Sequence, residues 1–253
     1  MAQPYAESNV LEFRCLGNFA FAAGDTWRDG PARGRGRSFL QYLATHSRAA
    51  VSRASLIEAL WPELDADACA HRLHLAVSGA RAALRGAVAC PSAILFRDDS
   101  YAWHPSVCIV ADTDRFSACY AEGTVEAMRE GIALYAGQFL AGDAGDWLVP
   151  FRTRYEHMYV TMLERLAVAA AKESDFAQGA DLALAAVAAD PAHEGATRLV
   201  MFCLAKSGRR SVALAGYDHL ERYLHRWLSI APTPETKSLR DQILAGLLPE
   251  TIS

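Results

Sequence analysis

One stretch of the sequence, residues 68–85, combines side chains that could bind nucleic acid with a spacing that would bring them together. Apolar residues at a 4-3-4 spacing predict the buried face of a helix, formed by Leu73, Val77, Ala80 and Leu84. The side chains off this stripe are basic or form hydrogen bonds: His71, Arg72, His74, Ser78, Arg81 and Arg85. Such a face is either simply solvated or enters a DNA groove, where cations reach phosphates and hydrogen-bonding groups reach base edges.

The elements around this helix predict a winged helix-turn-helix domain. Strand-like residues and a first helix precede it, at residues 10–21 and 38–46. Ser52 is a good N-cap for a second helix, which ends at Trp61-Pro62 because proline disfavours helix in the residue before it. A β-hairpin follows at residues 93–103. In this order of elements the third helix lies in the major groove and the hairpin forms the wing.

The remaining sequence is almost entirely helical. Segments with apolar periodicity, separated by glycine or proline breaks, lie at 112–122, 125–136, 146–173, 176–189, 193–206, 209–227 and 234–247. Ser174-x-Phe176-x-x-Gly179-Ala180 and Gly208-x-Arg210-x-x-Ala213-Leu214 lie 34 residues apart, which is the tetratricopeptide period. The sequence therefore predicts a mainly α protein with a small β portion, in which an all-α tetratricopeptide-like domain follows the winged helix.

Charge is distributed unevenly along the 253 residues. The net charge of −4 argues against a protein that covers nucleic acid with its whole surface. Residues 1–105, however, carry 11 arginines and 10 acidic residues, a net charge of +1, whereas residues 106–253 carry −5. Six arginines and one aspartate within residues 27–53 give this segment a local charge of +5. We therefore expect a DNA-facing part first and a different surface after it.

These patterns predict four parts of the chain. They are an N-terminal tail, a winged-helix DNA-binding domain, a helical domain and a C-terminal tail, at residues 1–9, 10–105, 106–248 and 249–253.

Several classes of protein do not fit the sequence. No apolar run reaches the roughly 18 residues of a membrane span. With no signal peptide and irregularly spaced cysteines, we expect reduced thiols and a cytoplasmic protein. Cys69, His71 and His74 do not converge as zinc ligands, and no nucleophile–base pair or Gly-rich phosphate loop is present. We expect no enzyme activity, no metal and no cofactor.

The ordered motifs resemble those of the SARP family of antibiotic-pathway activators. In the first half, Val51-Ser52-Arg53, Leu56 to Pro62, and Val77 to Leu84 resemble a response-regulator-type winged helix. The second half resembles that family's bacterial transcriptional activator domain at Asp112 to Phe116, Ala133 to Leu140, Trp147 with Arg152, Asp190-Pro191 with Glu194, Ala213-Leu214 with Tyr217, and Pro232 to Thr236. The resemblance covers about residues 10–245.

The resemblance implies a sequence-specific DNA-binding activator of biosynthetic or secondary-metabolism genes. Such proteins bind direct-repeat sites in double-stranded promoter DNA, often as two protomers, and contact RNA polymerase. We therefore expect promoter DNA and RNA polymerase as partners, a homodimer on DNA, and no contact with membranes. The alternative is a helical-repeat protein-interaction module with weak or no specific DNA binding.

Individual DNA contacts follow from the resemblance and from the side-chain chemistry. Arg81 matches the family's third-helix arginine and is expected to hold a phosphate or read a base, with an ion pair to the sheet or the second domain as the alternative. Arg72, His71, His74 and Ser78 are the other expected contacts of this helix. Arg53 should meet phosphate at a helix N-terminus.

Further contacts are expected outside the third helix. Arg97 lies on the wing, and Arg35 and Arg37 either bind phosphate or form a solvated arginine loop. Glu63 and Asp65 lie in an acidic loop that either touches polymerase or merely connects two helices.

Two departures from the family pattern predict weaker DNA binding by each protomer. Gly79 stands where many relatives have a base-reading arginine, and the wing tip carries Asp98 and Asp99. We expect cooperative pairing on repeated sites to compensate for this loss.

Overall fold

The computed structural model describes the chain from residue 9 onward with short gaps. The described residues are 9–31, 34–64, 66–248 and 250. The expected tails, residues 1–9 and 249–253, therefore lie almost wholly outside the described part.

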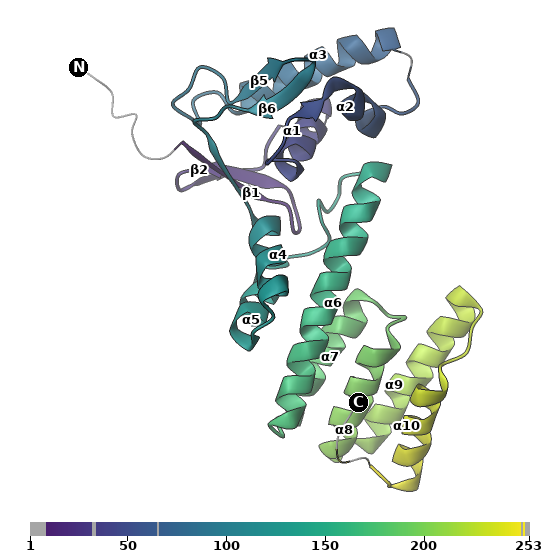
Figure 1. The fold of residues 1–253 in the computed structure, drawn as a ribbon. Helices are drawn as coiled ribbons and strands as arrows, with labels where there is room; N and C mark the ends of the chain where they lie inside the picture. The colour runs from purple at the N-terminus through teal and green to yellow at the C-terminus, as the bar shows by residue number, and fades with distance from the viewer. Residues whose placement is uncertain (1–8, 32–33, 65, 249, 251–253) are drawn as a thin grey trace. The chain divides into compact units, whose positions relative to one another are not determined.

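The chain divides into two compact units, whose segments can be followed in Figure 1 by the colours that run with residue number. The first unit contains residues 1–116 and 134–153, and the second contains residues 117–133 and 154–253. The chain thus leaves the first unit and later returns to it. The domain boundary near residue 105, which the charge pattern predicts, stays a prediction.

A four-stranded sheet opens the first unit, in the order β3-β2-β1-β7. Its strands are β1 (Val10–Arg14), β2 (Ala20–Ala23), β3 (Thr26–Arg28) and β7 (Cys108–Ala111). β1 pairs antiparallel with β2, with Phe13 opposite Phe21, and parallel with β7, with Leu11 opposite Ile109. The buried rings of Phe13 and Phe21 lie 6.1 Å apart between centroids and form part of the core.

Three helices and a second, three-stranded sheet complete the winged helix-turn-helix. They are α1 (Arg35–Thr45), α2 (Arg53–Leu60), α3 (Ala66–Ala83), β4 (Val51–Ser52), β5 (Ile94–Arg97) and β6 (Ser100–Trp103). The sheet has the order β4-β6-β5. The N-cap prediction for α2 is confirmed, since the Ser52 hydroxyl accepts the Ser55 N–H at 3.0 Å.

Two glycines lie where α1 and α3 cross with their backbones close together. A methyl group on Gly36 of α1 would lie 3.3 Å from the Ala76 carbonyl oxygen, the Ala80 nitrogen and the Gly79 carbonyl carbon of α3. A methyl group on Gly79 would lie 3.6 Å from the Gly36 Cα, which is an ordinary contact. The close crossing therefore requires a glycine at position 36, whereas Gly79 lies at the crossing with room for a methyl group.

Residues 134–153 return to the first unit and pack against α1. The Asp143 carboxylate accepts a hydrogen bond from Gln41 Nε2 at 2.8 Å and pairs with Arg37 Nε at 3.2 Å. Trp147, in the 3₁₀ turn Asp146–Leu148, packs on Tyr42 with the ring centroids 5.1 Å apart. This segment is therefore part of the packing that holds α1 in place.

Arg152 gives the same segment its internal shape. Its guanidinium donates to the carbonyl oxygens of Phe139, Leu140 and Asp143 at 3.0, 2.9 and 2.8 Å. Three carbonyl groups that would otherwise need water are satisfied by one side chain.

The second unit is helical. The helices from α4 onward are α4 (Asp112–Glu122), α5 (Val125–Leu134), α6 (Val149–Lys172), α7 (Phe176–Ala189), α8 (Glu194–Lys206), α9 (Arg210–Tyr223), a π-helical turn (Leu224–Leu228) and α10 (Pro234–Ala245). Figure 1 shows α7, α8, α9 and α10 stacked side by side. Their shared core is built around the buried helix α8, with Ala183, Phe202 and Tyr217 among its members.

The tetratricopeptide-like repeat is visible in the backbone. Ser174 and Gly208, 34 residues apart, both adopt positive φ, at 64° and 76°, just before α7 and α9. Gly179 and Ala213 are another pair of corresponding positions in the repeat. Ala213 is fully buried, and a methyl group on Gly179 would come within 2.9 Å of the Cys203 sulfur. The fold prediction, a winged helix followed by a tetratricopeptide-like helical domain, is confirmed. Among the described residues, no helix has the length and apolar character to cross a bilayer.

Candidate nucleic-acid interface

Helix α3 has the two faces that the sequence predicts. Leu73, Val77, Ala80 and Leu84 are buried, each with at most 5% of its surface exposed. The opposite side chains of His71, His74, Ser78, Arg81 and Arg85 are exposed. Positions 71, 74, 78 and 81 follow the helical period and form one outward stripe of α3, whereas Arg72 lies beside it and is half-buried. Leu84 and Arg85 lie in the turn just after the helix.

One member of the outward stripe was missed by sequence reasoning. Leu75 is 50% exposed, four residues after His71 and three before Ser78. Its place in the helical period was the available signal. An exposed apolar side chain among hydrogen-bonding ones matches the methyl group of thymine, which only the major groove presents.

Arg81 is anchored on the wing. Its Nε and Nη2 donate to the Ile94 carbonyl oxygen of β5 at 3.3 and 2.9 Å. With Arg85 it also lines a cavity of about 390 Å³ at the C-terminal end of α3. The alternative expected for Arg81 is an ion pair with the sheet or the second domain, and the contact that the structure shows is a hydrogen bond to a neutral carbonyl group of β5. A guanidinium has five N–H donors, so this bond uses only part of its capacity.

Arg53 starts α2 near the same surface. Its backbone N–H donates to the Asp99 carbonyl oxygen at 2.9 Å, which ties the wing turn to the start of α2. Burial raises the pKa of the Tyr101 phenol, and the positive charges of Arg81 and Arg53 oppose this rise. Both arginines are therefore close enough to Tyr101 for their charges to act on it.

The wing turn has a specific backbone conformation. Asp98 and Asp99 both have positive φ, at 49° and 52°, which is typical of a two-residue type I′ hairpin turn. Arg97, the last residue of β5, is exposed beside them. The wing thus presents one cation and two carboxylates at its tip.

Arg37 is engaged within the first unit. Its guanidinium pairs with Asp143, donates to the Asp29 carbonyl oxygen at 2.6 Å and lies over the Phe19 ring. Only 14% of its side chain is exposed. Arg35 contributes the first backbone position of α1, and its side chain lies outside the described residues.

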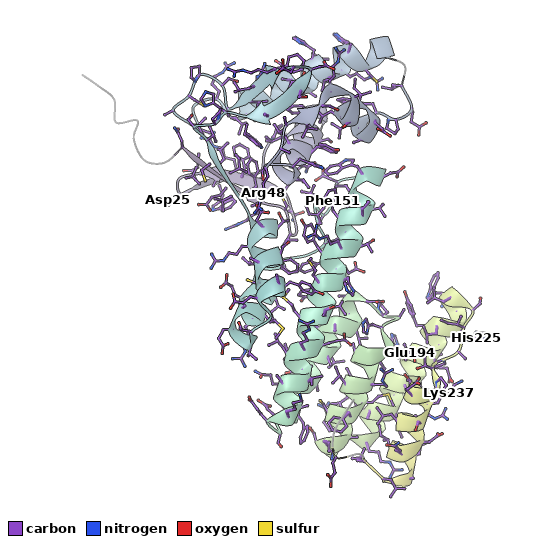
Figure 2. The ribbon with its side chains drawn as sticks, viewed as in Figure 1. Asp25, Arg48, Phe151, Glu194, His225 and Lys237 are labelled. Atoms are coloured by element: carbon purple, nitrogen blue, oxygen red, sulfur yellow. The ribbon has the colours of Figure 1, made fainter. Side chains whose placement is uncertain are left out.

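Other basic and acidic groups lie outside α3 and the wing. Arg48, which is labelled in Figure 2, is exposed, and it pairs with Asp114 at 3.6 Å. Glu63 is exposed in the loop before α3, and Asp65 lies outside the described residues. In the part of the chain that the structure describes, no three His, Cys, Asp or Glu side chains come together as metal ligands would.

Known proteins share both the sequence pattern and the fold. A family model described as the bacterial transcriptional activator domain matches residues 111–244. Regulatory protein AfsR of Streptomyces coelicolor is 25% identical over 256 residues, which cover 94% of this chain and 24% of that protein. AfsR of Streptomyces griseus is 31% identical over 113 residues, 45% of this chain and 12% of that protein. The chain thus spans a quarter or less of the curated relatives that it matches.

A solved structure has the same arrangement. Mycobacterium tuberculosis EmbR, in complex with a low-affinity phosphopeptide, is similar with a TM-score of 0.75 and 23% identity. The match covers 94% of this chain and 66% of that one. At this identity the match shows a common fold.

Proposed function

Because this chain belongs to the bacterial transcriptional activator domain family, and its sequence and fold are those of a SARP-type regulator, we propose that it binds promoter DNA sequence-specifically and activates transcription. The observation that carries the proposal is the outward stripe of α3, which is free of the core and rich in groups that read DNA. The regulated genes are biosynthetic or secondary-metabolism genes, and the sites are direct repeats occupied by two protomers. The protein acts in the cytoplasm.

The stripe divides into base-reading and phosphate-binding positions. His71, His74 and Ser78 contact base edges, and Leu75 contacts a thymine methyl group. Arg81, fixed by Ile94, binds phosphate or a guanine edge, and its anchoring lowers the entropy lost on binding. Arg72, half-buried beside the stripe, supports these contacts from its edge.

Phosphate contacts from outside α3 complete the interface. Arg53 acts at the N-terminus of α2, where the helix dipole also favours an anion, and Arg97 acts from the wing. Arg37 is left out of this surface because Asp143 already neutralises its charge. Arg35 stays a predicted contact.

Gel-shift titrations of the full chain on its promoter test the proposal. We expect Arg81→Ala to weaken binding by roughly tenfold and to lower the slope of log affinity against log salt by about 0.9, the value for one lost phosphate contact. Arg209→Gln, which removes an exposed arginine of the second unit, is the matched control and should change neither quantity.

Two outcomes would contradict the proposal. Unchanged affinity and slope for Arg81→Ala would remove this residue from the interface. Equal binding of the wild-type chain to promoter and random DNA, without a salt slope, would favour the helical-repeat interaction module with weak or no specific DNA binding.

Glu63 and Asp65 are proposed as a contact with RNA polymerase, because Glu63 is exposed beside the N-terminal end of α3. The double variant Glu63→Ala, Asp65→Ala should lower transcription in a reconstituted assay and leave the gel shift unchanged. A parallel loss of both activities would show that the loop is structural.

A further inference from the structure

The second unit contains a cavity that DNA binding does not use. It has a volume of about 510 Å³ and lies between α6 and α8, within the helical repeat. Pockets of roughly 300–1,000 Å³ are typical of sites for small organic molecules. An inorganic anion alone would leave most of this volume empty.

The cavity combines an apolar wall with an excess of positive charge. Val168 of α6 and Leu199 of α8 contribute apolar surface, and Leu199 is 4% exposed in total. Arg165, Lys172 and Arg198 contribute three cations, against the single carboxylate of Glu164. The lining therefore favours a ligand that has both an apolar body and a negative charge.

The contacts of the charged side chains indicate where the negatively charged head of such a ligand would lie. Glu164 Oε1 lies 3.3 Å from His193 Nδ1, so this carboxylate already contacts a polar side chain. Arg198 donates to the Thr236 hydroxyl at 3.1 Å and is thereby directed toward α10. Lys172 and Arg165 are exposed, and Arg165 lies over the Tyr120 ring at 5.7 Å. These two cations from α6 are the ones best able to turn toward a ligand.

We propose that this cavity binds a small amphiphilic organic anion, with its apolar body against Val168 and Leu199 and its negative head between Arg165 and Lys172. The site is built entirely from the second unit and does not depend on the DNA contacts of α3. The inference goes beyond the proposed function, because it adds a ligand to the half of the chain that the family model covers.

A pair of fluorescent probes that differ in one charged group tests the charge requirement. The anionic probe is 1-anilinonaphthalene-8-sulfonate, and its uncharged counterpart, N-phenyl-1-naphthylamine, has the same aromatic body without the sulfonate. We expect the full chain to bind the anion at least tenfold more tightly, and we expect added salt to reduce this preference. Equal affinity for both probes, or binding of neither, would overturn the proposal.

Variants locate the binding. The double variant Arg165→Gln, Lys172→Gln should weaken binding of the anionic probe about tenfold and leave the neutral probe unchanged. Ala169→Leu, which places a larger side chain in the cavity wall, should weaken binding of both. Arg209→Gln combined with Arg222→Gln removes two exposed positive charges outside the cavity and is the charge-matched control, and near-ultraviolet circular dichroism checks that each variant is folded. If the double variant binds the anion as well as the control does, the site lies elsewhere and the proposal fails.

Discussion

Arg37 and Arg81 show that two arginines with the same expected role can have different partners in the structure. Both are expected to contact DNA, but Arg37 pairs with the carboxylate of Asp143, whereas Arg81 donates to the carbonyl oxygen of Ile94. A full negative charge satisfies a guanidinium far more completely than a neutral acceptor does. Asp143 lies 106 residues from Arg37, so no local pattern of the sequence could reveal this pair.

Gly36 and Gly79 give a prediction at the same scale. Gly36→Ala should destabilise the protein by about 1–3 kcal/mol, because the added methyl group meets three backbone atoms of α3 that cannot move separately. Gly79→Ala adds a methyl group at an ordinary distance and should stabilise by up to about 1 kcal/mol through helix propensity. Urea unfolding monitored by circular dichroism measures both. Equal effects of the two substitutions would contradict the close crossing.

Elements differ in how well the sequence predicts them. The long helices follow from apolar periodicity, and the predicted bounds of α4 and α7 agree with the structure. β4 has two residues and β3 has three, too few for an alternating pattern to stand out. β7 is formed by parallel pairing with β1, almost a hundred residues earlier, which depends on the whole fold. The outward stripe of α3 was predictable for the same reason as the helices, but the anchoring of Arg81 on β5 was not.

The wing turn gives the prediction for a single element. Asp98→Asn with Asp99→Gly should stabilise the hairpin by about 1 kcal/mol, because Asn-Gly suits the positive φ of a type I′ turn. The same change removes two negative charges near the proposed interface and should strengthen promoter binding several-fold at low salt. Thermal unfolding and gel shifts measure the two effects. Asp25→Asn, at the turn between β2 and β3 (Figure 2), removes a charge from another hairpin and should leave affinity unchanged.

At the scale of the molecule, the first unit is assembled from segments that are separated in the sequence. β7 pairs with β1, the Asp112 carboxylate accepts the backbone N–H groups of Cys15 and Leu16, and Asp143 holds Arg37 and Gln41. Burial raises the pKa of Asp112, and these backbone N–H groups partly offset the rise. The winged helix therefore uses residues from within the helical family domain to complete its own packing.

Truncation tests this assembly. A fragment of residues 1–105 lacks β7, Asp112 and Asp143, so β1 loses a strand partner and Arg37 loses its carboxylate. We expect it to unfold at a clearly lower temperature than a fragment of residues 1–153, measured by circular dichroism. Equal melting temperatures would support a self-sufficient domain that ends near residue 105.

The return of residues 134–153 to the first unit also has a consequence during protein synthesis. A domain made of one continuous segment can fold as soon as its last residue has emerged, but this winged-helix unit must wait for a segment that is translated after α4 and α5. At about 5–20 residues per second, the interval between residues 116 and 153 lasts roughly 2–7 s. During that interval the nascent chain carries an unfinished winged helix, in which Gln41 and Tyr42 of α1 still lack their partners Asp143 and Trp147, and this uncovered face of α1 would be a natural place for a chaperone to bind.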